Sequence, residues 1–182
     1  MFPALFLDRD GVIIENRPGY VRTWSDVSIY PQALAALVSI RESPYKIVIV
    51  TNQSAVGRGL ISLQTARQIN ERLLEELEAA GARIDGVYMC PHAPEEHCPC
   101  RKPKPGLLLV AAKELSLDLP RSILIGDALT DISAGQTAGV PRTILLRTGR
   151  GAVQAAKSAA SGLKPFLVYN NLSEALADLD LH

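Results

Sequence analysis

Short apolar runs recur along the chain, and helical patterns of apolar residues lie between them. The runs are continuous rather than alternating, which is typical of strands that are buried on both faces. This order predicts βαβ units and a three-layer α/β/α sandwich with a central parallel sheet. The predicted strands are Ala4–Leu7, Lys46–Val50, Ile84–Met89, Ser122–Ile125, Thr143–Leu146 and Phe166–Tyr169.

The helical segments carry start and stop signals. Ser62 can cap a helix with a stripe at Ile69, Leu73 and Leu77, and Gly81 is placed to end it. Other helices are predicted from Pro31, over Leu107–Leu115 after Pro105, over Asp131–Ala138 before Gly139, and after the capping pair Asn171 and Glu174.

Three stretches lack the alternation of apolar runs and helical patterns. Residues 11–30 and 90–105 read as loops, and the second contains five prolines. The stretch Thr148–Lys164 is rich in Gly, Ala and Ser, which favours a mobile connection or a weak helix. No linker separates domains, so we expect one domain over residues 1–182.

Composition excludes several classes of protein. Among 182 residues, Lys plus Arg and Asp plus Glu both number 19, so there is no basic excess for nucleic acid or an anionic membrane. No apolar run approaches the ~18 residues of a membrane span, and Met1-Phe2-Pro3 lacks the basic start of a signal peptide. We therefore expect a cytoplasmic protein. We also expect it to act as a monomer.

The first predicted strand ends in Asp8-Arg9-Asp10-Gly11. Residues i and i+2 of a strand point the same way, so Asp8 and Asp10 would repel each other unless a cation lay between them. Mg²⁺ suits such an oxygen pair. The alternative is an ordinary solvated turn.

Polar groups follow other strands as well: Thr51-Asn52-Gln53-Ser54, Arg101-Lys102-Pro103 in the third loop, and Gly126 to Asp131. Brought to one edge of a sheet, these groups supply a nucleophile, metal ligands, hydrogen-bond donors and a positive charge. Such a set is suited to moving a phosphoryl group.

The segments DRDG, TNQS, RKP and GDALTD, in this order, resemble the four motifs of the haloacid dehalogenase-like (HAD) phosphatase superfamily. The resemblance implies a HAD-like, Rossmann-type domain and an aspartyl phosphate formed on Asp8. It implies that Asp10 is the general acid and base, that Thr51 hydrogen-bonds the phosphoryl group and that Lys102 holds Asp8 and that group. Mg²⁺ would bind Asp8, the backbone carbonyl of Asp10, and Asp127, whereas Asp131 orients Lys102 or a water.

Three further segments resemble the histidinol phosphatase and D-glycero-D-manno-heptose 1,7-bisphosphate phosphatase family. They are TNQSAVGRG at Thr51–Gly59, Gly19-Tyr20-Val21 and Cys90-Pro91-His92. This resemblance implies a phosphomonoester hydrolase acting on a small phosphorylated sugar, by removal of the 7-phosphate of the heptose bisphosphate. The alternatives are a phosphatase of histidinol phosphate, of another sugar phosphate or of a nucleotide. A non-catalytic, zinc-stabilised binding module is a remote alternative.

All three cysteines lie between residues 90 and 100, an odd number that argues against a disulfide framework. Cys90, His92, Cys98 and Cys100 are similar to the zinc loop of that family. Three thiolates and one imidazole leave no open position, so the Zn²⁺ would be structural and would stiffen the loop before Lys102. His97 is an alternative ligand, and reduced cysteines without metal are an alternative to the site itself.

Only 40 residues lie between Asp10 and Thr51, which leaves no room for a separate cap domain. Loops must therefore form the substrate pocket, and Arg58 and Arg101 are the expected partners of a second phosphate. Either could instead be an ordinary surface arginine. Ala128 stands where the heptose enzymes usually have a basic residue. The predicted substrate-binding residues are Gly19, Tyr20, Asn52, Gln53, Ser54, Arg58 and Arg101.

Overall fold

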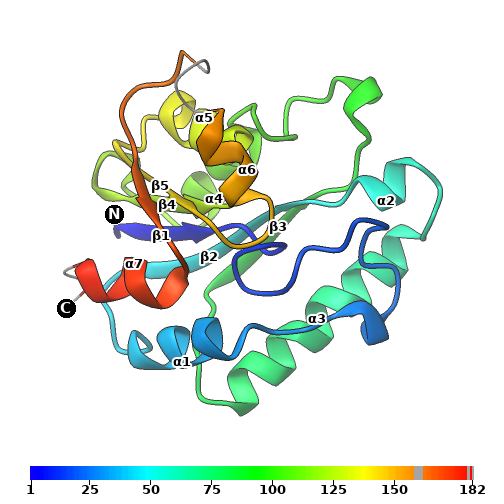
Figure 1. Cartoon of the computed structure of the whole chain (residues 1–182), viewed down its shortest axis with the longest axis horizontal. Helices are drawn as coiled ribbons and strands as arrows, with labels where there is room; N and C mark the ends of the chain where they lie inside the picture. Colours follow the sequence, from blue (N-terminus) through cyan, green and yellow to red (C-terminus); the bar gives the residue numbers. More distant parts are fainter. Residues whose placement is uncertain (158–161, 180, 182) are drawn as a thin grey trace.

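Six parallel strands form one sheet in the order β3-β2-β1-β4-β5-β6 in the computed structural model, which describes residues 1–157, 162–179 and 181 (Figure 1). This confirms the predicted central parallel sheet. The strands are β1 Ala4–Leu7, β2 Lys46–Asn52, β3 Gly86–Cys90, β4 Ile123–Gly126, β5 Arg142–Leu146 and β6 Leu167–Tyr169.

The third strand begins two residues later than predicted. The polar residue Asp85 interrupts the apolar run, and its carboxylate accepts hydrogen bonds from Ile47 N at 2.8 Å and Lys46 Nζ at 2.9 Å. The Asp85 backbone N also donates to Ile47 O at 2.7 Å, so the residue before Gly86 is held to β2 by both its backbone and its side chain. The pairing of β2 with β3 instead continues to Asn52 and Cys90, at the edge of the sheet where the polar motifs lie.

Alternate strand residues pack against opposite helix layers, as expected for a sheet covered on both faces. Leu5 and Leu7 pack in one buried cluster with α1, α3 and α7, while Ala4 and Phe6 pack in the other with α4 and α5 (Figure 1). The helices are α1 Pro31–Ser39, α2 Ser54–Gly57, α3 Leu63–Ala79, α4 Gly106–Glu114, α5 Leu129–Ala138, α6 Gly151–Ala156 and α7 Leu172–Asp178. These layers confirm the three-layer prediction.

The predicted caps of two helices are present. The Ser62 side chain accepts from Thr65 N at the start of α3, and Asn171 accepts from Glu174 N at the start of α7. Helix α5 begins at Leu129, two residues earlier than predicted, because Asp131 lies within its first turn and accepts from Ala128 N.

The loop over residues 11–30 is anchored in the core. Val12, Ile13, Ile14 and Val21 are at most 2% exposed, although no period in the sequence distinguishes them. The sequence did not predict the short helix α2 or three short 3-10 turns. These turns are Trp24–Asp26, Pro94–Glu96 and Leu119–Arg121.

The Thr148–Lys164 stretch begins with a loop and the short helix α6, which agrees with the weak-helix alternative there. Residues 158–161 of the stretch lie outside the described residues. Within the described part of the chain, none of the helices has the length and apolar character needed to cross a bilayer.

Candidate active site

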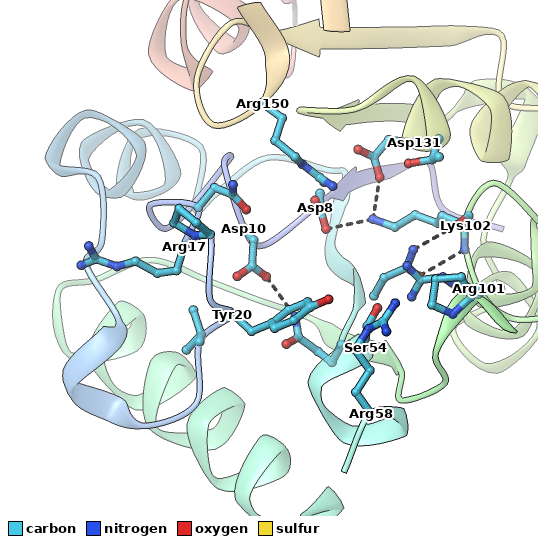
Figure 2. Close-up of a pocket in the computed structure, with 17 residues that line it drawn as sticks. Asp8, Asp10, Arg17, Tyr20, Ser54, Arg58, Arg101, Lys102, Asp131 and Arg150 are labelled. Carbon is cyan, nitrogen blue, oxygen red and sulfur yellow. Dashed lines mark hydrogen bonds and ion pairs between the residues drawn. The ribbon is translucent and has the colours of Figure 1, made fainter. Parts of the chain in front are cut away.

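The strand order reverses direction between β1 and β4, the position at which open α/β sheets bind ligands beyond the carboxyl ends of their strands. Asp8 follows β1 and Asp127 follows β4, so both carboxylates lie at this switch point. A cavity of about 390 Å³ opens there (Figure 2). Its lining residues are Asp8, Asp10, Asn16, Arg17, Pro18, Tyr20, Val21, Asn52, Gln53, Ser54, Arg58, Pro94, Arg101, Lys102, Thr130, Asp131 and Arg150.

Lys102 pairs with two carboxylates in the wall of the cavity. Its Nζ lies 2.8 Å from Asp8 Oδ1 and 2.6 Å from Asp131 Oδ1 (Figure 2). It also donates to Val50 O at 2.7 Å. The Asn52 side chain fixes the Lys102 backbone through two hydrogen bonds of 3.1 Å. Of the two roles predicted for Asp131, the geometry supports orientation of Lys102.

Burial and charge act in opposite directions on this pair. Burial raises the pKa of Asp8 to about 6, while the Lys102 ammonium works to lower it. Burial disfavours the charged form of Lys102, yet the carboxylates of Asp131 and Asp8 raise its pKa overall. Lys102 therefore remains a cation beside Asp8.

Removal of the Lys102 charge should impair both stability and activity. In Lys102→Met, two buried carboxylates lose their shared counter-charge, and we expect the free energy of unfolding to fall by about 3 kcal/mol or more. The phosphatase activity that the motifs predict should fall at least ~100-fold, because the cation next to Asp8 is gone. Denaturant unfolding and rates of phosphate release measure the two effects. Lys113→Met, at an exposed site on α4, is the matched control and should change neither; equal behaviour of the two variants would contradict this assignment.

Asp10 is held by three side chains on the other side of the cavity. Arg9 donates to both of its carboxylate oxygens at 3.0 and 3.2 Å, and Gln53 Nε2 donates to Oδ2 at 2.9 Å. Thr51 Oγ1 lies 3.5 Å from the same oxygen and accepts from Gln53 at 2.8 Å. Thr51 is fully buried and does not line the cavity itself.

Arg9 is only 1% exposed and also donates to Asn70 Oδ1 on α3 at 2.7 Å. Sequence reasoning did not assign a role to Arg9 or Asn70. The available signal was a charged residue inside an apolar strand terminus, because arginine is almost never fully buried unless it is paired.

The carboxylates of Asp8, Asp127 and Asp131 offer oxygen atoms that all lie within 4.8 Å of one another. Gly11 has a φ of +87°, and a Cβ there would stand 2.2 Å from Asp127 Oδ2, so only glycine permits this approach. Both oxygens of Asp131 are engaged by buried partners, Oδ1 by Lys102 and Oδ2 by Ala128 N. Lys102 contacts Asp8 through Oδ1, and the side chain that pairs with Asp127 is the half-exposed Arg150, so Asp8 and Asp127 fit a cation better than Asp131 does. An all-oxygen set of this kind fits Mg²⁺.

The other predicted substrate residues surround the cavity, with one exception. Tyr20, Asn52, Gln53, Ser54, Arg58 and Arg101 line it. Gly19 does not, and its carbonyl accepts from Arg22 Nε instead. Arg58 pairs with Glu95 at 3.2 Å, and Arg101 donates to His92 O at 3.1 Å, so both guanidiniums are already oriented.

The predicted zinc ligands lie together. The sulfurs of Cys90, Cys98 and Cys100 are 3.2 to 3.5 Å apart, and His92 Nδ1 lies 3.6 Å from Cys90 Sγ and 3.4 Å from Cys100 Sγ. Zn²⁺ with thiolates at about 2.3 Å spaces them about 3.8 Å apart in a tetrahedron, close to this arrangement. The exposed His97 is not part of the cluster. The donor set fits a closed, structural zinc site.

The zinc loop, residues 90–100, is joined to the substrate side of the cavity. Gln53 N donates to Cys90 O and Gly57 N donates to Pro91 O, each at 2.8 Å. A Cβ on Gly57 would lie 2.3 Å from Ala93 N, so α2 packs directly on this loop. Lys102 follows Cys100 by two residues, so the loop also fixes the backbone position from which the buried Lys102 side chain extends.

Arg150 is a cavity residue that sequence reasoning missed. It lies between β5 and α6, and its guanidinium pairs with both oxygens of Asp127. Burial raises the pKa of Asp127, and the hydrogen bonds from Arg150 counteract that shift. The available signal was the position of Arg-Thr-Gly-Arg-Gly after a predicted strand, at the same sheet edge as the other motifs.

Comparison with known proteins agrees with this geometry. A family model described as HAD-hydrolase-like matches residues 99–175. The D-glycero-beta-D-manno-heptose-1,7-bisphosphate 7-phosphatase of Photorhabdus laumondii is 37% identical over 94% of this chain and 92% of its own. The enzyme of the same name from Helicobacter pylori strain J99 is 45% identical over 79% of this chain and 82% of its own.

A crystal structure shows the same likeness. The D,D-heptose 1,7-bisphosphate phosphatase from B. bronchiseptica, complexed with magnesium and phosphate, superposes with a TM-score of 0.88 over 96% of both chains at 31% identity. The likeness covers nearly the whole length of both chains. The protein is therefore a HAD-like phosphatase and belongs to the family of D-glycero-D-manno-heptose-1,7-bisphosphate 7-phosphatases.

Proposed function

We propose that this phosphatase removes the 7-phosphate of D-glycero-D-manno-heptose 1,7-bisphosphate through an aspartyl phosphate on Asp8. The observation that carries the proposal is the Asp8 carboxylate, held by Lys102 at 2.8 Å next to a cavity that Asp10 also lines. The names of the relatives support the choice of substrate.

In the first half-reaction, an oxygen of Asp8 attacks the phosphorus of the 7-phosphate. The bond between phosphorus and the sugar oxygen breaks, and Asp10, in its protonated form, gives its proton to that oxygen. The phosphoryl group is then bound to Asp8, and the sugar leaves as an alcohol. Lys102 would stabilise charge on the phosphoryl oxygens. The Thr51 hydroxyl is buried next to Asp10 and does not line the cavity, so it would have to turn toward these oxygens to contribute as well.

In the second half-reaction, Asp10 accepts a proton from a water molecule, whose oxygen attacks the phosphorus. The bond from phosphorus to the Asp8 oxygen breaks, which releases inorganic phosphate and restores both carboxyl groups. The bonds from Arg9 and Gln53 hold the Asp10 carboxylate in place for both transfers.

Asp8, Asp127 and the backbone carbonyl of Asp10 would hold the Mg²⁺ of this reaction. When bound, it supplies positive charge that screens the two anions, the substrate phosphate and Asp8, from each other. Asp131 contributes through its 2.6 Å contact with Lys102 instead of through the metal.

Recognition of the second phosphate falls to Arg58 and Arg101. Both line the cavity, and the contacts with Glu95 and His92 O limit the freedom of their side chains before substrate binds. Tyr20, Asn52 and Ser54 would contact the sugar, with Gly19 shaping the loop behind Tyr20. We propose one catalytic domain that acts as a monomer in the cytoplasm, a reducing compartment suited to zinc-bound thiolates.

Initial rates on a panel of phosphate esters test the proposed substrate. With Mg²⁺ supplied, we expect the heptose bisphosphate, in one anomer or both, to give a kcat/KM at least ~100-fold above histidinol phosphate, common sugar monophosphates and a nucleoside monophosphate. Arg101→Ala should lower the rate on the bisphosphate far more than the slow rate on a monophosphate. A monophosphate preferred by the unaltered enzyme would contradict the assignment.

A further inference from the structure

Arg150 forms the largest set of polar contacts to Asp127. Its Nη2 donates to Asp127 Oδ1 at 2.9 Å, its Nε to Oδ2 at 3.2 Å, and its backbone N to Oδ2 at 2.8 Å. Asp127 is completely buried, whereas the Arg150 side chain is 51% exposed. The guanidinium thus covers one of the two carboxylates assigned to the cation.

The backbone beneath Arg150 is fixed. Thr148 Oγ1 donates to Gly11 O at 2.6 Å, and Gly149 has a φ of +57°, with any Cβ placed 2.4 Å from Asp127 Oδ2. A Cβ on Gly151 would stand 1.5 Å from Leu146 O. The backbone of residues 148–151 therefore packs tightly against the site. The guanidinium of Arg150 can change position by rotation of its half-exposed side chain alone.

The Arg150 guanidinium lies near Asp8, the proposed nucleophile. Figure 2 shows its guanidinium reaching toward Asp8, with Arg58 on the other side of the cavity. Although burial acts against the charged form, Asp127, Asp8 and Asp131 together raise the pKa of Arg150, so it remains a cation. A phosphoryl group bound to Asp8 would be attracted by the positive charge of Arg150.

We propose that Arg150 is a further substrate-binding residue, whose guanidinium pairs with Asp127 before the reaction and turns to the phosphoryl oxygens once Asp127 is a metal ligand. This inference rests on the proposed phosphatase mechanism. It gives Arg150 two opposite effects: the guanidinium competes with a divalent cation for Asp127, and it strengthens the binding of phosphate.

The competition follows from charge. A guanidinium in contact with both oxygens of Asp127 repels a divalent cation at the same carboxylate, and the repulsion is large where water is excluded. The planar fork that matches a carboxylate also matches two phosphoryl oxygens, so the side chain exchanges one bidentate partner for another.

Arg150→Gln tests both effects with probes that contain no sugar. In the substrate-free protein, Mn²⁺ binding measured by electron paramagnetic resonance should be about fivefold tighter than in the unaltered protein. With Mg²⁺ saturating, inorganic phosphate should bind about tenfold more weakly, the loss expected for one charge-assisted contact. Arg150→Lys should keep part of the phosphate affinity because it keeps the charge.

Arg147→Gln is the matched control, since Arg147 is an exposed arginine on the same loop and does not line the cavity. It should leave both affinities unchanged. The proposal is overturned if Arg150→Gln weakens Mn²⁺ binding, which would make Arg150 a support for the metal ligand, or if phosphate affinity stays within twofold. A failure of the heptose assignment would appear in the substrate panel and leave these two measurements unaffected.

Discussion

Asp8→Asn is expected to abolish phosphatase activity, with a loss of kcat of about ten-thousandfold. An amide is neutral and does not attack phosphorus, so no aspartyl phosphate forms. The fold should persist, because Lys102 keeps its partners Asp131 and Val50 O. Release of inorganic phosphate measures the rate, and acid quenching of the unaltered enzyme during turnover should trap a phosphorylated peptide that contains Asp8.

Glu42→Gln is a suitable control for this experiment, because it also removes one carboxylate charge and its side chain is 89% exposed. It should leave kcat and the unfolding transition unchanged. If Asp8→Asn retains its fold and more than a tenth of the activity, Asp8 is not the nucleophile.

Loss of the proposed zinc ion should have the largest effect on stability. We expect His92→Asn to lose bound zinc and to reduce the free energy of unfolding by about 4 kcal/mol, or roughly 10 °C in Tm for a chain of this size. Activity should fall as well, since the loop that precedes Lys102 is then no longer tied to Cys90. Metal analysis, thermal unfolding and phosphate release measure the three effects.

His97→Asn provides the matched comparison. His97 is exposed, lies outside the thiol cluster and has a φ of +49°, a conformation that asparagine tolerates. This variant should keep its zinc, its Tm and its activity. Equal zinc content and equal stability in the two variants would refute the structural zinc site.

Much of the fold could be predicted because strands buried on both faces leave continuous apolar runs. The order of those runs predicted the parallel sheet, and local signals such as the Ser62 cap gave helix boundaries. The predicted start of β3 at Ile84 was wrong. Ile47 N donates to the Asp85 carboxylate, a side-chain contact between residues 38 apart that the apolar run does not reveal.

The candidate site divides in the same way. Residues within a motif, such as Asp8 and Lys102, could be found because their spacing and order are distinctive. Arg9 and Arg150 were missed, since their contacts with Asn70 and Asp127 join segments that are distant in the sequence. A loop rich in Gly, Ala and Ser is typical of a mobile connection, and only its packing against Gly11 gives Arg150 a fixed origin.

The position of the phosphate that is lost tests the central claim most directly. Phosphorus nuclear magnetic resonance can follow D-glycero-D-manno-heptose 1,7-bisphosphate during incubation with the enzyme and Mg²⁺. We predict loss of the 7-phosphate signal with equal growth of inorganic phosphate, while the signal of the 1-phosphate persists. Loss of the 1-phosphate first, or no release of phosphate under conditions in which the enzyme cleaves another ester, would contradict the account.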